Sequence, residues 1–179
     1  RQSVQDVTLQ VRANELVGIA GVGGNGQREL IEVICGVREI EGGAVRFGDH
    51  AVGWDHDLSA SVARIPGDRQ RHGLALGLSL WENLHLGRWH QRQMVRKGLI
   101  DRNGAHRWSA ELLEQFDVRS AGPDQPAGEL SGGNQQKAVL ARELADDPEL
   151  VIAMNPCRGL DIAASRFVLE QLLAVRERG

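Results

Sequence analysis

The chain has 179 residues, of which 41% are hydrophobic and 25% are charged, values typical of a single globular domain. Lys and Arg number 21 against 24 Asp and Glu, and the net charge of -3 argues against nucleic acid as the main ligand. No run of about 18 apolar residues is present, so we expect no segment of this sequence to span a membrane.

The first quarter of the chain has the pattern of two strands, a turn and a helix. Apolar and polar residues alternate at the start, a short apolar run follows, and a helical face appears after the glycines. This order is typical of a phosphate-binding unit. The expected ranges are a half-buried strand at 4–12, a central strand at 15–20, a turn at 21–26 and a helix from Gln27 that stops near Gly36.

Strands and helices continue to alternate along the rest of the chain, which predicts an α/β sheet with a helical insertion. Within the insertion, Trp108, Leu112, Leu113 and Phe116 share one helical face and are predicted core residues. The expected elements are an antiparallel hairpin at 42–54, a strand at 62–66, a mostly helical segment at 79–120, a helix from 131–133 to about Asp146, a strand at 149–154 and a helix from about Asp161.

The cysteines and histidines give no sign of a metal centre. Cys35 and Cys157 lie far apart and form no CxxC motif, which indicates buried thiols more than a disulfide or a metal pair. The six histidines are scattered without ligand spacing. The glycines concentrated at 21–26 and 132–133 instead indicate places where the backbone approaches a ligand closely.

The loop at 21–28 has the spacing of the Walker A phosphate loop, GxxxxGK[ST], in which glycines let backbone N–H groups surround the phosphates. Gln27 stands at the Lys position and lacks its charge, and Arg28 stands at the Ser/Thr position and cannot coordinate a cation. Taken alone, the loop is compatible with weak nucleotide binding or with a tight turn that binds nothing. Its candidate binding residues are Gly21, Gly24, Asn25, Gly26, Gln27 and Arg28.

The octapeptide LSGGNQQK at 130–137 stands at the expected start of a helix. Its two glycines leave backbone amides bare, and a helix N-terminus carries about half a positive charge, so the segment suits a γ-phosphate. The simpler alternative is a serine N-cap followed by a flexible turn. The candidate binding residues are Ser131, Gly132, Gly133, Asn134 and Gln135.

LSGGNQQK resembles the signature motif of the ABC ATPases. Downstream, 150–156 resembles the Walker B strand and 159–161 resembles the D-loop, in the order of that family. The resemblance implies an ABC-ATPase core in a single domain over 1–179, with a small antiparallel β subdomain and a helical subdomain at about 79–133. It also places Asp161 in the D-loop and Asp68 near the Q-loop, although Gly67 stands where the family has Glu. A solvated surface pair is the alternative for Asp68 and Arg69.

Walker B normally ends in Asp-Glu, which hold Mg²⁺ and polarise the attacking water. Met154 and Asn155 stand at these positions; Met offers no oxygen ligand and Asn is a poor proton acceptor, so we predict no catalytic residue here. Together with Gln27 and Arg28, these departures resemble the degenerate C-terminal nucleotide-binding domain of tandem importers for simple sugars and purine nucleosides.

ABC domains close head to tail, so that each ATP lies between one Walker A loop and the partner's signature. The resemblance therefore implies that ATP and Mg²⁺ are held mainly by a partner domain and completed by this chain's signature. It implies as partners a second nucleotide-binding domain in the same polypeptide, transmembrane permease subunits and, indirectly, a periplasmic or lipoprotein solute-binding protein, with no nucleic acid. The expected location is peripheral, on the cytoplasmic face of the membrane.

The motifs lead to one further expectation and leave two alternatives open. Because the sequence ends before the family's switch histidine, we expect a piece of a longer tandem protein. A fully competent ATPase that uses Arg28 in place of Lys stays open as an alternative. So does a non-transport ABC protein that acts on DNA or ribosomes, although the sequence has no long coiled-coil arm and no basic face.

Overall fold

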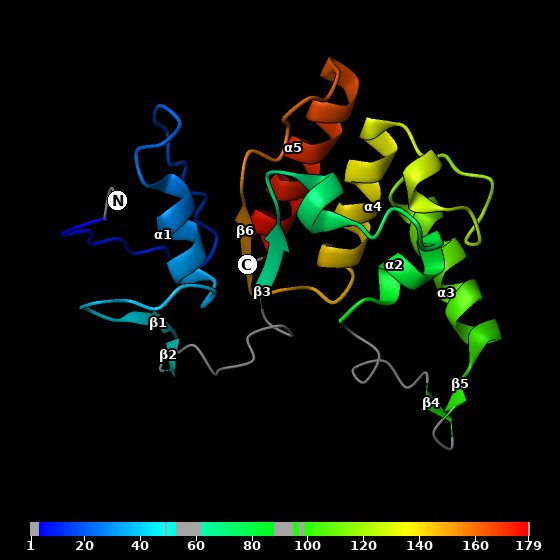
Figure 1. The fold of residues 1–179 in the computed structure, drawn as a ribbon, viewed down its shortest axis with the longest axis horizontal. Coiled ribbons are helices and arrows are strands. Elements are labelled where there is room, and N and C mark those ends of the chain that lie inside the picture. Colours follow the sequence, from blue (N-terminus) through cyan, green and yellow to red (C-terminus); the bar gives the residue numbers. More distant parts are fainter. Residues whose placement is uncertain (1–3, 49, 53–61, 88–94, 97–98, 179) are drawn as a thin grey trace. The chain divides into compact units, whose positions relative to one another are not determined.

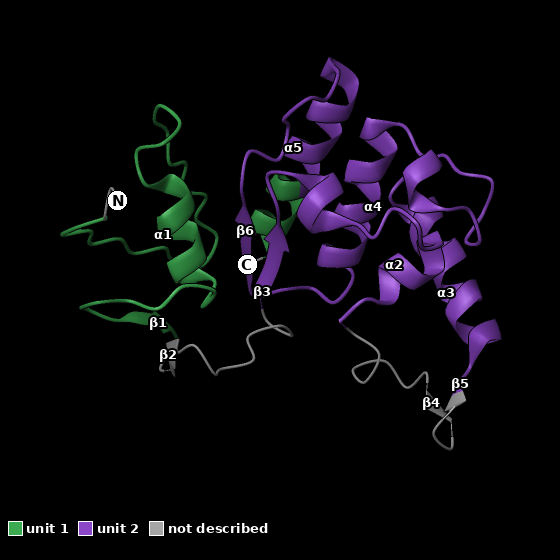
Figure 2. Cartoon of the chain, in the orientation of Figure 1, with its two compact units in different colours: residues 1–58, 172–179 green, residues 59–171 purple. Residues whose placement is uncertain are grey.

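The computed structural model describes residues 4–48, 50–52, 62–87, 95–96 and 99–178. The chain divides into two compact units, residues 1–58 with 172–179 and residues 59–171 (Figure 2). The elements are α1 (Gln27–Ile34), β1 (Val45–Phe47), β2 (His50–Val52), β3 (Val62–Ile65), the π-helix η1 (Arg69–Gly73), α2 (Leu80–His85), β4 (Val95–Arg96), β5 (Leu99–Ile100), α3 (Arg102–Gln115), the 3₁₀-helix η2 (Ala127–Glu129), α4 (Gly132–Leu144), β6 (Leu150–Ala153) and α5 (Ile162–Arg178).

The first unit holds the glycine turn, α1 and the β1–β2 hairpin (Figure 1). The turn at 21–26 and the helix start at Gln27 are confirmed, and Gly36 follows the helix with a φ of 68° that suits glycine. The antiparallel hairpin predicted at 42–54 is confirmed over β1 and β2, while positions 49, 53 and 54 lie outside the described residues.

The strands predicted at 4–12 and 15–20 are wrong, because these residues form no strand in the structure. Apolar alternation defines a face for burial, but a strand also needs a neighbour whose N–H and C=O groups pair with its own. Within the described residues no strand pairs with this segment. Its apolar side chains are correspondingly exposed, with Leu16 at 55% and Ile19 at 49%.

The second unit is built around a parallel pair of strands and a central helix. β3 pairs with β6 in the register Val62 with Leu150 and Ile65 with Ala153, as the strands predicted at 62–66 and 149–154 require. Helix α4 packs against β3 on one side and against α2 and α3 on the other, so it joins the sheet to the helical segment (Figure 1). Its buried face consists of Gln135, Gln136, Ala138, Val139, Leu140, Ala141 and Leu144.

The helical segment predicted at 79–120 is helical in α2 and α3 and also contains a short β4–β5 hairpin that the apolar pattern did not indicate. Residues 88–94 and 97–98 lie outside the described part. Leu112, Leu113 and Phe116 are buried as predicted, whereas Trp108 is half-buried. Among the described residues, no helix combines the length and apolar character needed to cross a bilayer.

One buried amide organises the entry into α2. Asn83 is 1% exposed, accepts a hydrogen bond from the Ala75 N–H at 2.8 Å and donates to the carbonyls of Ala75, Leu78 and Ser79. Ser79 caps the helix, since its hydroxyl accepts from the Glu82 N–H while the Glu82 carboxylate accepts from the Ser79 N–H. The loop before α2 is thus fixed by side chains that satisfy its backbone groups.

Candidate functional site

The glycine loop before α1 adopts a backbone that side chains tolerate poorly. Gly24 and Gly26 have φ values of 94° and 95°, and Gly26 forms the N-cap of α1 without any side-chain cap. The residues at 21–25 are exposed and Gly26 is buried. The helix N-terminus therefore keeps bare amides with a partial positive charge, which is the general requirement for holding a phosphate.

The two side chains that follow these glycines are engaged with neighbouring groups of the same unit. Gln27 folds back over the loop, and its Nε2 donates to the Val22 carbonyl at 3.2 Å. The Arg28 Nε lies 3.7 Å from the Glu32 carboxylate one turn along the exposed helix surface. Gln27 is neutral and engaged within the loop, and the charge of Arg28 is paired with Glu32, which also binds Arg38 at 2.6 Å.

The N-terminus of α4 stands where the sequence predicted a phosphate cradle. Ser131 is the exposed N-cap, while Gly132, Gly133 and Asn134 are half-buried. The first turn carries no acidic residue, so nothing on the helix itself neutralises its dipole. The Ser131 Oγ accepts from the Asn134 amide N–H at 3.4 Å and from its side-chain Nδ2 at 3.2 Å, which leaves the hydroxyl proton available as a donor.

The side chains of the next two candidate residues are hydrogen-bonded within the second unit. Asn134 accepts a hydrogen bond from the Arg119 N–H at 3.0 Å, which ties the helix start to the segment after α3. Gln135 is 2% exposed; its Oε1 accepts from Gln70 at 3.2 Å and its Nε2 donates to the Ala127 carbonyl at 3.3 Å. Ser131 is thus exposed and the two glycines are half-buried, whereas the Gln135 side chain is buried within the unit.

The end of β6 carries the two residues at the Walker B positions. Met154 is half-buried and its N–H donates to the Ile65 carbonyl at 2.9 Å, whereas Asn155 is exposed with a φ of 44°. A Cβ placed on Gly67 would lie 3.2 Å from the Met154 Cγ, Sδ and carbonyl oxygen. Met154 therefore fills the space that a side chain at 67 would occupy. A thioether and an amide at this strand end do not match the carboxylate oxygens that Mg²⁺ prefers.

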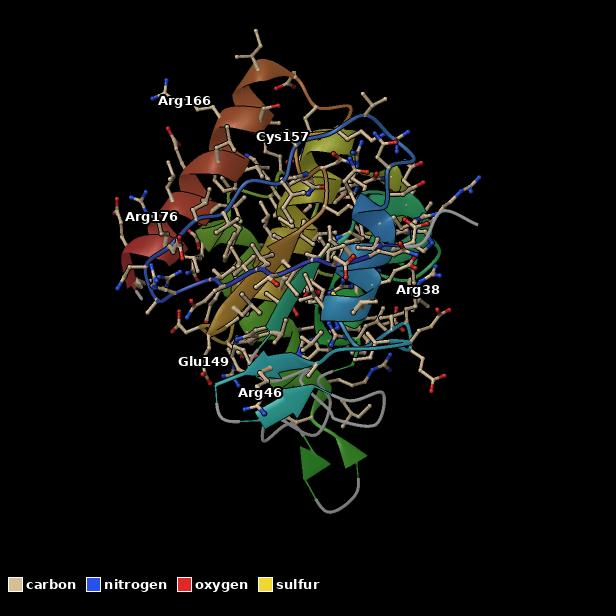
Figure 3. All side chains as sticks on the ribbon, turned by 90° about the vertical axis from the view of Figure 1, so that its left-hand side faces the viewer. Arg38, Arg46, Glu149, Cys157, Arg166 and Arg176 are labelled. Carbon is tan, nitrogen blue, oxygen red and sulfur yellow. The ribbon has the colours of Figure 1, made fainter. Side chains whose placement is uncertain are left out.

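Asp161 at the D-loop position caps the last helix. Its Oδ1 accepts from the Ala164 N–H at 2.7 Å, so this oxygen is engaged with the first turn of α5. Both cysteines are free thiols: Cys35 is buried as predicted, while Cys157 is half-buried in the segment before α5 (Figure 3). Its Sγ donates to the Ser165 carbonyl at 3.8 Å.

Asp68 and Arg69 do not form the solvated pair that sequence left open. Asp68 caps η1, accepting from the N–H groups of Gln70 at 3.2 Å and Arg71 at 3.1 Å. The hydrogen bond from the Arg71 backbone is the main cause that lowers the pKa of Asp68 below its ordinary 3.8. The Arg69 Nη1 instead donates to the Arg158 carbonyl at 3.0 Å. Sequence reasoning missed the contacts of Arg69 and Gln70, since neither the Asp-Arg pair nor the apolar pattern indicates a π-helix.

Comparison with known proteins identifies the family of this chain. A family model described as ABC transporter matches residues 4–158. The chain is 38% identical to the nucleoside import ATP-binding protein NupA of Lactococcus lactis, covering 98% of this chain and 35% of that protein. It is 36% identical to the guanosine import ATP-binding protein NupO of Bacillus subtilis, covering 99% of this chain and 36% of that protein. The ribose import ATP-binding protein RbsA of Corynebacterium glutamicum is 37% identical over 97% of this chain and 33% of its own length.

The chain spans about a third of the length of these relatives. Among solved structures, the dimeric ATP-binding cassette MJ0796 bound to ADP and Pi aligns with a TM-score of 0.77 at 22% identity, covering 95% of this chain and 73% of the cassette. This likeness confirms the predicted α/β fold of an ABC-ATPase core. With the family match over residues 4–158 and these relatives, the chain belongs to the ABC transporter family.

Proposed function

We propose that this chain is a nucleotide-binding domain of an importer for nucleosides or simple sugars, and that it serves ATP held by a partner domain. The names of the relatives support the solute class, since they describe nucleoside, guanosine and ribose import. In this proposal the domain lies at the cytoplasmic face of the membrane. Its partners are a second nucleotide-binding domain in the same polypeptide, permease subunits and, indirectly, a solute-binding protein.

The observation that carries the proposal is the contrast between two helix N-termini. At α1, the side chains that should bind phosphate and cation are engaged elsewhere: Gln27 with Val22 and Arg28 with Glu32. At α4, Ser131 is exposed, its hydroxyl proton is available and no acidic residue shares the first turn. A chain that keeps one phosphate cradle and has lost the other suits a site shared between two domains.

Each residue of this chain then has a limited task. The amides of Gly132 and Gly133 and the Ser131 hydroxyl donate to the outer phosphate oxygens of a nucleotide bound by the partner. Asp161 holds the start of α5, where Ala164 lies against Gly133. ATP with Mg²⁺ supplies the phosphoryl chemistry when bound. Gln27 and Arg28 after the glycine loop lack the side chains that Mg·ATP hydrolysis needs, and so do Met154 and Asn155 after β6. We therefore assign no step to either segment.

The test uses the complete importer with its partner domain, reconstituted in lipid. Ser131→Arg fills the cradle and is expected to lower ATPase turnover by about 100-fold or more, as when one transition-state donor is removed. Asn155→Ala, at the chain's own exposed strand end, is the matched control and is expected to leave turnover within about twofold. Full activity of Ser131→Arg contradicts the shared site, and a large loss in Asn155→Ala favours a competent ATPase in this chain.

A further inference from the structure

The π-helix η1 lies along one face of the signature helix α4. Gln70 in η1 donates from its Nε2 to Gln135 at 3.2 Å, and a Cβ on Gly73 would lie 3.1 Å from Val139. A Cβ on Gly132 would lie 2.5 Å from the Arg69 Nη2. The three α4 positions, Gly132, Gln135 and Val139, are three and four residues apart and so share one face. The segment after β3 is therefore packed along the first two turns of the helix.

Arg69 joins this helix start to a second segment. Its Nη1 donates to the Arg158 carbonyl at 3.0 Å, in the loop directly before the D-loop residues 159–161. Its Nη2 lies against the Gly132 backbone, which only a residue without a Cβ allows. The Nε is buried and has no hydrogen-bond partner among the described residues. One guanidinium thus spans the gap between the signature and the residue that precedes the D-loop.

This arrangement runs against simple electrostatics. A cation beside a helix N-terminus is unfavourable, because the bare amides already carry a partial positive charge. Arg71, two residues along, behaves as a surface arginine: its side chain is 80% exposed and its Nε lies 3.8 Å from Asp68. Arg69 is held inward by the Arg158 carbonyl and by the absence of a side chain at 132. These contacts fix the Arg69 side chain between Gly132 and Arg158.

We infer that Arg69 is a positioning residue that sets the spacing between the signature turn and the D-loop. The inference rests on the proposed function, in which both segments face the nucleotide of the partner domain. Without the bridge, α4 and the segment at 158–161 sample more arrangements, and only a fraction of them is competent to close. The ATP concentration needed for half-maximal turnover then rises by the inverse of that fraction.

The test measures ATP KM and kcat in the reconstituted importer. Arg69→Gln is expected to raise KM by at least about fivefold, which corresponds to a competent fraction of one fifth. Arg69→Lys keeps the charge but has one donor group in place of the fork, so it cannot span both contacts and is expected to raise KM similarly. Arg71→Gln is the matched control, with the same charge change on the same short helix and no expected effect.

A double-mutant cycle separates positioning from general weakening. Gly132→Ala displaces the guanidinium from Arg158, so it raises KM alone but adds less than about twofold once Arg69→Gln is present. Additive effects, rescue by Arg69→Lys, or an Arg69→Gln KM equal to that of Arg71→Gln would each overturn the inference. If the Arg69 variants fail to assemble, an unchanged KM in Gly132→Ala overturns it as well.

The outcome is distinguishable from failure of the proposed function. Ser131→Arg is measured in the same preparation, and its loss of turnover establishes that the signature serves the partner site. If Ser131→Arg abolishes turnover while Arg69→Gln leaves KM unchanged, the shared site stands and the positioning role of Arg69 fails. If Ser131→Arg has no effect, the proposed function fails and the inference fails with it.

Discussion

At the residue scale, Gly67 and Met154 are in contact: a Cβ at 67 would meet the Met154 side chain and carbonyl at 3.2 Å. The Met154 side chain occupies the space that a side chain at 67 would need. A change at either position therefore also alters the packing at the other.

This contact predicts coupled effects on stability. Gly67→Ala is expected to destabilise the protein by about 1–2 kcal/mol, because Met154 must shift to admit the methyl group. In a Met154→Ala background the same change is expected to cost about 0.5–1 kcal/mol less, since only the carbonyl contact remains. Urea unfolding of the four proteins in this cycle measures the coupling. A purely additive cycle contradicts the proposed fit between the two positions.

At the element scale, sequence patterns located most helices and strands but misjudged those whose formation depends on partners. The glycine turn, α1, α4 and the β3–β6 pair have strong local signals, such as the exposed Ser131 cap and the buried apolar runs. The segment 4–20 has the right alternation and yet forms no ladder among the described residues, because alternation does not supply a neighbour. The π-helix η1 was missed, because the Asp-Arg dipeptide at its start is common in sequences and does not indicate a helix cap.

The candidate site divides in the same way. The motif named Ser131, Gly132 and Gly133, whose chemistry lies in their own backbone and hydroxyl groups. It could not show that the Gln135 side chain is 2% exposed or that Arg69 reaches Arg158, because both facts depend on how η1 packs against α4. The sequence predicts which residues carry donor groups, whereas the residues that position them are determined by tertiary contacts.

A cap gives the sharpest element-scale prediction. Ser79→Ala removes the hydroxyl that accepts from the Glu82 N–H, which is one of the two hydrogen bonds of the α2 capping box. The change is expected to cost about 1 kcal/mol of folding free energy. Ser79→Thr keeps the acceptor and is the control, with an expected cost below about 0.5 kcal/mol. Chemical denaturation compares the variants. Equal loss in both would mean that the cap hydrogen bond does not stabilise this end of α2.

At the scale of the whole molecule, acid stability depends on carboxylates that are hydrogen-bonded in the fold. The pKa of Asp68 is lowered mainly by the Arg71 backbone, that of Glu82 by the Ser79 hydroxyl and that of Asp117 by Lys137. A group with a lowered folded pKa binds fewer protons in the native state than in the unfolded one. Its contribution is present above its ordinary pKa, 3.8 for Asp and 4.5 for Glu, and is lost as the pH falls through the folded value.

The midpoint temperature of thermal unfolding is therefore expected to be constant above about pH 5 and to fall as the pH drops toward about 3. Asp117→Asn abolishes one of the three titrations and is expected to make the acid slope shallower. Lys137 keeps a partner in this variant, because its Nζ also donates to the Asp117 carbonyl at 2.9 Å. An unfolding temperature that rises between pH 5 and 3 would contradict the direction of these pKa changes.

Helix α4 begins at the surface with Ser131 and ends buried at Leu144, beside β3. Its 13 residues form a stiff rod about 20 Å long, and a rod does not compress when its tip is loaded. A displacement of Ser131 along the helix axis is therefore expected to reach β3 with little attenuation. The exposed end of the helix and the sheet are in this way mechanically linked.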